Sequence, residues 1–457
     1  MKITLVNAPV IRYKNKSPKK SLKVKLYSLL NSRNKLKKVS NIIKFNEDFR
    51  FGVRAGSRWP WTMENPPGAP HFPFIMAYTA SLLRQEGHIV NLIDSVAEEE
   101  YSYKKFIKKV KQDNAEIVII ECSTPTIDID LWMALEISKF TKVALAGPHL
   151  TDINAQFIHQ KHPEISFLLK GEYILSSLEM VNTKIKGIYE SVIVKDLDSI
   201  PFPLRDYPFA IKYFDPTMPT EKPQLQIYGS KGCPFKCTFC LWPQTMYNGT
   251  VSIREPENIA LEIKECISKY GYKSIFFDDD TFNLGTERIS KLCDYLKEIG
   301  LPWTMMGRLD CSPDWLYDKM IDCGCVGMRF GVETFNVNVL KSINKGLERT
   351  DFIKTLIYLS NKYPRLMIRL TMMKDIPAQT EEIQHRDMEI LNEIGYSSNT
   401  VTRNYQLSSC VPFPGTKMYN DLKLEKGEEF LNNFNLYDGS QDTVLTKEKR
   451  KNDKTKK

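Results

Sequence analysis

Short apolar runs alternate with amphipathic stretches along most of this 457-residue chain, and this alternation constrains the fold more than any other feature. In the first part of the chain, apolar runs of strand length stand at 2–9, 88–95, 116–122, 142–149 and 165–172. Segments with a helical period, such as 74–87, separate these runs. Because parallel strands need crossover connections, which are usually helices, we predict a five-stranded, doubly wound α/β domain over 1–195.

The same alternation resumes after a proline-dense connector at 196–223, which we predict to be a linker between domains. Six further runs of strand length stand at 224–230, 274–282, 302–310, 327–334, 365–374 and 401–409. Strict alternation with helices predicts a parallel sheet curled into a partial, TIM-like (β/α)6 barrel over 224–420, followed by a C-terminal extension at 421–457. In both sheets we expect the functional face at the carboxyl ends of the strands.

The net charge of +9 is concentrated in two segments. Residues 12–44 hold twelve Lys and Arg and no acidic residue, whereas residues 447–457 hold seven basic and two acidic residues. The combined positive charge of these two segments is larger than the net charge of the whole chain, so the remaining residues are acidic overall. We expect the basic insertion at 11–60 and the basic tail to be solvated arms, with a phosphate-bearing or membrane-surface partner as the alternative.

The composition also indicates the compartment. No run of about 18 apolar residues occurs, so we predict no membrane span. The N-terminal residues lack the pattern of a secretion signal, which predicts a cytoplasmic protein. In that compartment the ten cysteines are expected to stay reduced, which favours metal or redox use over disulfides.

Three cysteines fall within the segment SKGCPFKCTFCL at 230–241, namely Cys233, Cys237 and Cys240. A structural zinc site needs four ligands in tight pairs, but no histidine stands between residues 163 and 384 and the next cysteine is Cys266. Thiolate is the preferred ligand of iron–sulfur clusters, and three thiolates on a 4Fe–4S cluster leave one iron without a protein ligand. We therefore predict a 4Fe–4S cluster, whose open iron can coordinate a substrate or cofactor.

A C-x3-C-x2-C motif just after the first strand of a predicted (β/α) barrel resembles the radical S-adenosylmethionine superfamily. Further segments resemble its branch with a cobalamin-binding domain: FFDDDTF (276–282), MMGRLD (305–310), GCVGMRFGVETFNVNVLKSINKG (324–346) and PFPGTKMY (412–419). The resemblance covers about residues 1–420. One segment departs from it, because KDIPAQT (374–380) stands where the branch usually has G-x-P-G-E-T, which puts the glycine contacts there in doubt.

The resemblance implies roles for several residues of the predicted barrel. Cys233, Cys237 and Cys240 would ligate the cluster, and the open iron would chelate the methionine part of S-adenosylmethionine. Phe239, the aromatic residue before the last cysteine, would contact the cofactor. Arg308 and Glu333 would contact the adenosyl ribose and the methionine part, with a surface salt bridge as the alternative. Asp279, within the run Asp278 to Asp280, would bind cofactor hydroxyls, with a solvated turn as the alternative.

The N-terminal sheet resembles the Rossmann-like, cobalamin-binding domain of the same branch. A large, flat ligand on the strand ends suits small residues, and we expect cofactor contacts from Ser123, Thr124, Gly147 and Gly171. The D-x-H-x-x-G signature, which supplies an axial histidine in many cobalamin proteins, is absent. His149 is the only histidine at a predicted strand end, and hydrogen bonding within a loop is the alternative to cofactor contact for it.

Taken together, the resemblance implies a cobalamin-dependent radical S-adenosylmethionine enzyme, a methyltransferase acting on an unactivated carbon or on phosphorus. Its cofactors would be a 4Fe–4S cluster, S-adenosylmethionine and cobalamin, and its partners a small-molecule substrate and an electron donor such as flavodoxin or ferredoxin. One alternative is a non-methylating rearrangement or cyclisation on the same architecture. Another is a nucleic-acid-modifying or nucleic-acid-binding protein, suggested by the basic segments, although no RNA-binding module is evident. The sequence does not identify the substrate.

Overall fold

The computed structural model describes residues 1–13, 49–53, 62–64, 71–98, 100, 102–349, 351–439 and 443–446. Most of the basic insertion, most of the Trp/Pro-rich loop at 59–73 and the basic tail therefore lie outside the described residues. The chain divides into two compact units. The first comprises 1–194, 199–213 and 245–248, and the second comprises 195–198, 214–244 and 249–457.

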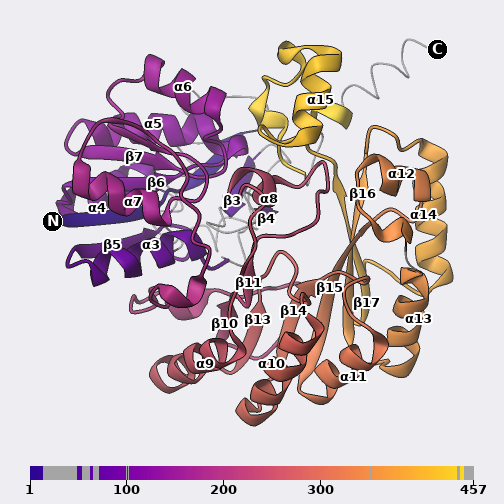
Figure 1. Cartoon of the computed structure of the whole chain (residues 1–457). Helices are drawn as coiled ribbons and strands as arrows, with labels where there is room; N and C mark the ends of the chain where they lie inside the picture. The colour runs from indigo at the N-terminus through magenta and orange to yellow at the C-terminus, as the bar shows by residue number, and fades with distance from the viewer. Residues whose placement is uncertain are drawn as a thin grey trace, which may run out of the picture. The chain divides into compact units, whose positions relative to one another are not determined.

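The first unit contains a six-stranded parallel sheet in the order β5-β1-β6-β7-β8-β9 (Figure 1). Its strands are β1 (Lys2–Asn7), β5 (Ile89–Asp94), β6 (Ile117–Glu121), β7 (Lys142–Ala146), β8 (Phe167–Leu169) and β9 (Gly187–Tyr189). The five strands predicted from the apolar runs are present, but the sixth, β9, was missed. The strand order reverses at β1, which places the switch point of the sheet between β1 and β6.

The helices of this unit connect the strands as the alternation predicts. They are α3 (Phe74–Gln85), α4 (Tyr103–Asp113), α5 (Ile127–Ser138), α6 (Asp152–Lys161) and α7 (Ile174–Thr183). A small antiparallel sheet, β2 (Val10–Tyr13), β3 (Phe49–Val53) and β4 (Thr62–Glu64), was not predicted. Strand β2 overlaps the start of the segment expected to be a solvated arm, and β3 lies within that segment.

The second unit contains a six-stranded parallel sheet in the order β10-β13-β14-β15-β16-β17, which is the chain order of the six predicted strands. Its strands are β10 (Gln224–Ile227), β13 (Ser274–Phe277), β14 (Trp303–Gly307), β15 (Cys325–Glu333), β16 (Met367–Lys374) and β17 (Arg403–Ser409). A two-stranded ribbon, β11 (Ser230–Lys231) and β12 (Ser252–Ile253), flanks the cysteine segment. The prediction of a parallel-sheet α/β architecture is confirmed.

Helices follow or connect the strands of the second unit. They are α8 (Leu241–Thr245), α9 (Pro256–Tyr270), α10 (Thr286–Ile299), α11 (Asp314–Asp322), α12 (Val337–Ser342), α13 (Phe352–Lys362), α14 (Glu381–Glu393) and α15 (Lys417–Lys426). Helices α9 and α10 end at Gly271 and Gly300, whose positive φ provides the left-handed cap that glycine adopts without strain. Among the described helices, none is both long and apolar enough to cross a membrane.

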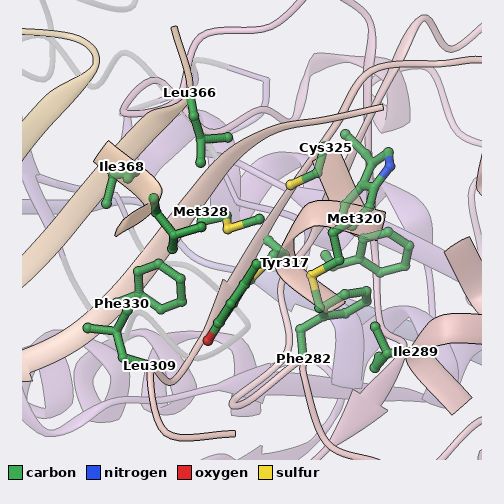
Figure 2. Close-up of a cluster of buried hydrophobic side chains, with 14 of the residues drawn as sticks. Phe282, Ile289, Leu309, Tyr317, Met320, Cys325, Met328, Phe330, Leu366 and Ile368 are labelled. Carbon is green, nitrogen blue, oxygen red and sulfur yellow. The ribbon is translucent and has the colours of Figure 1, made fainter. Parts of the chain in front are cut away.

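The core of the second unit lies between the sheet and these helices (Figure 2). Alternate strand residues enter it, such as Met328 and Phe330 on β15 and Ile368 on β16, and they meet Tyr317 and Met320 of α11. A second apolar cluster joins α12, the loop after β17 and α15. Because the strands are held on one face by packing, their carboxyl ends and the loops that follow are positioned rigidly.

Candidate functional site

The cysteine segment is a coil between β11 and α8, held by hydrogen bonds to other parts of the second unit. The side-chain amide of Gln244 donates to the carbonyl oxygens of Cys237 (3.1 Å) and Cys240 (2.7 Å). Asn344 Nδ2 donates to the Lys236 carbonyl at 2.9 Å, and Thr238 N–H donates to the Ile343 carbonyl. These contacts satisfy the backbone of an irregular loop, which fixes its course.

Gly232 opens this loop, and its position requires glycine. Its φ is +85°, and a Cβ atom there would lie 2.1 Å from the Thr250 carbonyl oxygen. The N–H of Gly232 donates to the Asp280 carboxylate at 2.9 Å. The loop therefore starts from a close approach of two backbone segments that a side chain would prevent.

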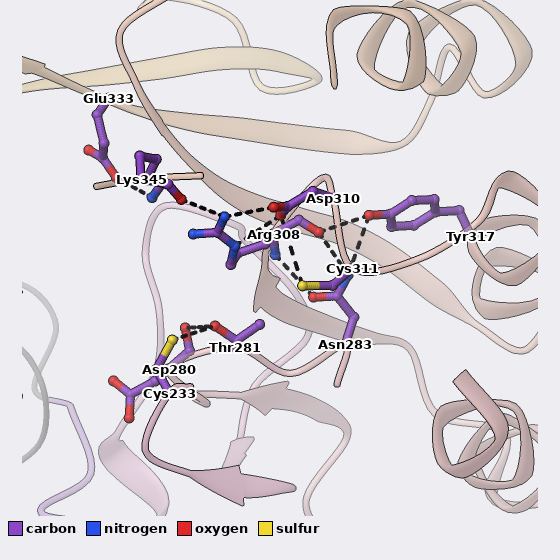
Figure 3. Close-up of polar contacts among 10 residues, drawn as sticks. All are labelled: Cys233, Asp280, Thr281, Asn283, Arg308, Asp310, Cys311, Tyr317, Glu333 and Lys345. Carbon is purple, nitrogen blue, oxygen red and sulfur yellow. Dashed lines mark hydrogen bonds and ion pairs between the residues drawn. The ribbon is translucent and has the colours of Figure 1, made fainter. Parts of the chain in front are cut away.

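The three cysteines lie close enough to influence one another's ionisation. Burial raises the pKa of the Cys240 thiol strongly, and the nearby Cys237, Asp280 and Cys233 raise it further. Burial also raises the pKa of Cys233, whose Sγ lies 3.3 Å from Thr281 Oγ1 (Figure 3). Because the pKa of the Cys233 and Cys240 thiols is raised, a nearby cation would favour their thiolate forms, and iron in a cluster would provide that charge.

Among the described residues, no group of three or more His, Cys, Asp and Glu side chains converges on a single-ion site. A 4Fe–4S cluster does not require such convergence, because each thiolate binds a different iron atom. The donor chemistry of the cysteine segment therefore fits a cluster better than a single metal ion.

The predicted cofactor residue Asp279 makes its hydrogen bonds to the chain that leads into the cysteine segment. Its carboxylate accepts from Gly229 N–H at 2.8 Å and from Ser230 Oγ at 2.7 Å. Asp279 is fully buried. The acidic run after β13 thus anchors the start of the loop, which is a positioning role rather than the solvated turn.

Arg308 and Glu333 stand at the ends of β14 and β15, where the sequence predicted them (Figure 3). Arg308 donates to both oxygens of Asp310, at 2.9 and 2.7 Å, and its guanidinium lies 3.6 Å from the centroid of the Phe235 ring. Burial opposes the charge of Arg308, but the hydrogen bonds and charge of Asp310 raise its pKa. Both residues are buried, so neither forms the surface salt bridge that was the alternative.

The partner of Glu333 is Lys345, a residue that the sequence did not single out. Lys345 Nζ donates to Glu333 Oε1 at 2.9 Å, and its own carbonyl accepts from Arg308 at 2.7 Å. Burial opposes the charge of Lys345, yet the charges of Glu333 and Cys237 raise its pKa. Lys345 lies in the INKG segment of the sequence, but only the structure shows that it is a buried cation beside the thiols.

Three further residues shape this edge. Glu333 has a φ of +69°, a left-handed conformation that costs a non-glycine residue energy and turns its side chain toward Lys345. At Gly331, a Cβ atom would lie 2.8 Å from both Glu333 Oε1 and Lys345 Nζ. Cys311, a fourth cysteine, has a pKa raised to about 12 by burial, with contributions from Asp310 and Cys233. No pattern in the sequence indicated that Cys311 lies near the cysteine segment.

Phe239, the remaining predicted cofactor residue of this unit, packs against the apolar cluster that contains Val339 and Met418. It thereby ties the cysteine segment to α12 and α15. The second unit thus gathers three cysteines, Asp279, Arg308, Glu333 and Phe239 around the carboxyl ends of β10 to β15.

In the first unit, four of the five predicted residues lie at the ends of β6 and β7. His149 Nδ1 lies 3.1 Å from Thr124 Oγ1, and Ser123 Oγ lies 2.8 Å from Thr126 Oγ1. Burial lowers the pKa of His149 to about 3, so its ring is neutral at physiological pH. Thr126 Oγ1 also donates to Asp130 Oδ2 at 2.7 Å, so these neutral side chains are hydrogen-bonded to one another and to a buried carboxylate of α5.

The predicted glycines of the first unit serve backbone packing. A Cβ atom at Gly147 would lie 2.5 Å from the Cys122 carbonyl oxygen, and one at Gly171 would lie 2.9 Å from Ser191. Gly171 follows β8, apart from the cluster around His149. The residues of this edge fit a large uncharged ligand through surface contact, and the contacts described for them provide no ligation of a metal.

Comparison with known proteins links this geometry to a family. Residues 227–386 match the protein family described as the Radical SAM superfamily. An uncharacterised methyltransferase from Pyrococcus horikoshii is 26% identical over 76% of this chain and 77% of its own length. The bacteriochlorophyllide d C-12(1)-methyltransferase of Chlorobaculum tepidum is 23% identical over 54% of this chain and 52% of its own. The chain thus spans about half the length of the second relative.

A solved structure shares the fold. The radical S-adenosylmethionine methyltransferase TsrM from Kitasatospora setae, with cobalamin and a [4Fe-4S] cluster bound, aligns with a TM-score of 0.59 and 15% identity. The alignment covers 78% of this chain and 72% of that one, so the similarity extends beyond the residues of the family match.

Proposed function

We propose that this chain is a radical S-adenosylmethionine enzyme, namely a cobalamin-dependent methyltransferase acting on an unactivated carbon, or on phosphorus, of a small molecule. The observation that carries the proposal is the fixed loop that presents Cys233, Cys237 and Cys240 beside a buried Lys345–Glu333 ion pair. When bound, the cluster would supply the electron that cleaves S-adenosylmethionine, and cobalamin would carry the methyl group.

The chain's own residues would hold and orient these groups. The three thiolates would ligate the cluster, while Gln244 and Asn344 keep the loop in place before and after loading. Arg308 and Glu333 would contact S-adenosylmethionine from the strand ends, and the charge of Lys345 would offset that of the thiolates. Asp279 would act by holding the loop, because its described hydrogen bonds are with Gly229 and Ser230.

The proposal assigns the domains as follows. Residues 1–195 form the cobalamin-binding domain, with Ser123, Thr124, Gly147, His149 and Gly171 on its ligand face, and residues 196–223 form the linker. Residues 224–420 form the partial barrel, and 421–457 an extension. An electron donor such as flavodoxin or ferredoxin would reduce the cluster in the cytoplasm. The neutral His149, hydrogen-bonded to Thr124, supports cobalamin bound by surface contact without an imidazole from a D-x-H-x-x-G motif.

The test is an assay of S-adenosylmethionine cleavage on protein purified anaerobically, with and without added cobalamin. We expect 5'-deoxyadenosine in both cases, and S-adenosylhomocysteine only when cobalamin is present. A Cys240→Ala variant that still forms 5'-deoxyadenosine would overturn the cluster assignment. Formation of 5'-deoxyadenosine without any S-adenosylhomocysteine would instead favour a non-methylating radical reaction.

A further inference from the structure

The sheet of the second unit has a face that points away from its hydrophobic core. Leu225, Ile275, Met305, Phe330 and Ile368 belong to the core, so the residues that alternate with them lie on the opposite face, which we call the inner face. The inner face carries Gln226, Phe276, Thr304, Met306, Arg329, Arg369, Thr371, Asn404 and Gln406. This composition is polar and includes two arginines.

Arg329 and Arg369 are direct neighbours across β15 and β16. Arg329 donates to Asp215 Oδ2 at 2.6 Å and also to the Thr217 hydroxyl. Arg369 donates only to neutral amides, Asn404 Oδ1 at 2.6 Å and Gln406 Oε1 at 3.3 Å. Of the two neighbouring guanidinium groups, Arg329 is therefore paired with a carboxylate, whereas Arg369 is hydrogen-bonded to neutral amides.

Arg369 has no carboxylate within ion-pair distance in the part of the chain that the structure describes, and its buried Nε has no hydrogen-bond acceptor there. Burial and the charge of Arg329 together lower its pKa to about 10, against the opposing effect of Asp215. An uncompensated, partly desolvated cation is costly, and an anion at this position would remove that cost.

Solvent reaches the inner face although the strands are central. Met306, Arg369, Thr371 and Gln406 are only half-buried, whereas Met305, Phe330 and Leu370, which alternate with them, are buried in the core. Thr304, also on the inner face, is fully buried and its Oγ1 has no hydrogen-bond partner among the described residues. The inner face thus offers an unused guanidinium donor in a place that small molecules can reach.

We propose that Arg329 and Arg369 bind an anionic group, a carboxylate or a phosphate, of the enzyme's small-molecule substrate. This inference rests on the proposed function and adds a substrate class to it. The planar guanidinium matches both oxyanions through paired N–H donors. Arg329 precedes Glu333 by four residues on β15, about 13 Å along an extended strand. The substrate's anionic end would therefore lie deeper along the strands than the site at their carboxyl ends.

The experiment measures thermal unfolding midpoints of anaerobically purified, cluster-loaded protein against inorganic phosphate or acetate, with potassium chloride matching the ionic strength. We expect a saturable rise with phosphate or acetate, and the stronger of the two identifies the substrate's anionic group. In Arg369→Gln the apparent affinity should fall at least about tenfold, the loss of one charged contact. Arg386→Gln, which changes an exposed arginine of α14, is the matched control and should respond like the wild type.

Several outcomes would overturn the proposal. A wild-type response no larger than that to potassium chloride would do so, and so would equal responses of wild type and Arg369→Gln. Without anions, Arg369→Gln should be at least as stable as the wild type, because it loses no ion pair and relieves repulsion from Arg329. A lowered midpoint with unchanged phosphate affinity would assign Arg369 a structural role. If Arg369→Gln does not fold, Arg369→Lys should show the weakened affinity.

Cleavage of S-adenosylmethionine by the same wild-type preparation reports separately on the proposed function. Cleavage without anion binding would leave the proposed function standing and reject the arginine site. Anion binding without cleavage would reject the proposed function and leave the arginines as an anion site of another enzyme class.

Discussion

The carboxyl-end edges of the two parallel sheets present different kinds of side chain. In the first unit, Ser123, Thr124 and His149 are neutral and hydrogen-bond to groups within their own edge. In the second unit, the edge holds three thiols, two of which, Cys233 and Cys240, have a raised pKa, and a buried Lys345–Glu333 ion pair. The difference indicates that the second edge offers thiols and charged groups, whereas Ser123, Thr124 and His149 offer neutral side chains at the first edge.

The largest effect is expected from replacing one of the three cysteines of the second edge. Cys237→Ser should abolish the iron–sulfur cluster, because a hydroxyl replaces a thiolate ligand, and should reduce S-adenosylmethionine cleavage by at least about a hundredfold, toward the rate without cluster catalysis. The matched control is Cys311→Ser, since Cys311 is also close to Cys233. Iron and sulfide content of anaerobically purified protein measures both variants. Equal loss of iron in the two variants would show that Cys311 is a ligand as well.

The next largest effect is the difference in stability loss between removing a buried ion pair and removing an exposed one. In Lys345→Met, Glu333 keeps its charge in a buried position without its cation, and we expect a loss of about 3–5 kcal/mol in the free energy of unfolding. Lys354→Met removes an exposed partner of Asp351, and we expect a change of less than about 1 kcal/mol. Denaturant titration of both proteins measures the difference.

A double variant tests whether the loss in Lys345→Met comes from the stranded carboxylate. Glu333→Gln combined with Lys345→Met should recover a large part of the stability, because no buried charge then remains unpaired. Equal stability of Lys345→Met and Lys354→Met would contradict the comparison between the two edges.

The first unit also holds buried carboxylates near its strand ends, and one of them is Asp94 at the end of β5. Burial raises its pKa to about 6, although Tyr213 donates to it at 2.8 Å and the N–H groups of Val96 and Ala97 donate as well. The nearby Glu98 also raises this pKa. Because the folded state holds this proton more tightly than the unfolded state, Asp94 lowers stability progressively as the pH rises from about 4 to about 6.

Asp94→Asn should therefore gain stability relative to the wild type over that pH range, by roughly 3 kcal/mol in total. Asparagine keeps an oxygen for the backbone N–H donors, so the native contacts are largely retained. The measurement is the difference in unfolding free energy between the two proteins at pH 4, 5, 6 and 7. A difference that does not change with pH would show that Asp94 ionises normally in the folded protein.

The sequence predicted the elements whose signals are local. Eleven apolar runs correctly predicted strands of the two sheets, and the C-x3-C-x2-C spacing of the cysteines indicated the loop. Strand β9 (Gly187–Tyr189) was missed because three residues are too few for a periodic signal. Pairing across long separations was also invisible: Arg329 finds Asp215, 114 residues away, only because β15 and the segment before β10 meet in the fold.

Residue roles were harder to predict than positions, because a role depends on the partner. Asp279 was correctly placed after β13, but its described hydrogen bonds go to Gly229 and Ser230. Lys345 was one of many lysines until the left-handed backbone of Glu333 directed a carboxylate to it. The charge of a buried side chain is set by such contacts, and those contacts are tertiary.

The smallest expected effect comes from removing the hydrogen bond between Thr124 and His149 at the first edge. Thr124→Val removes the hydroxyl beside His149 Nδ1 while keeping the shape of the side chain, so we expect a loss of about 1 kcal/mol, the net value of one neutral hydrogen bond. Cobalamin retained per mole of purified protein should stay within about twofold of the wild type, because surface contact does not depend on that hydroxyl. Retained stability with lost cobalamin would instead make Thr124 a direct cobalamin contact. The first edge would then resemble the second, because both would bind a cofactor through specific side chains.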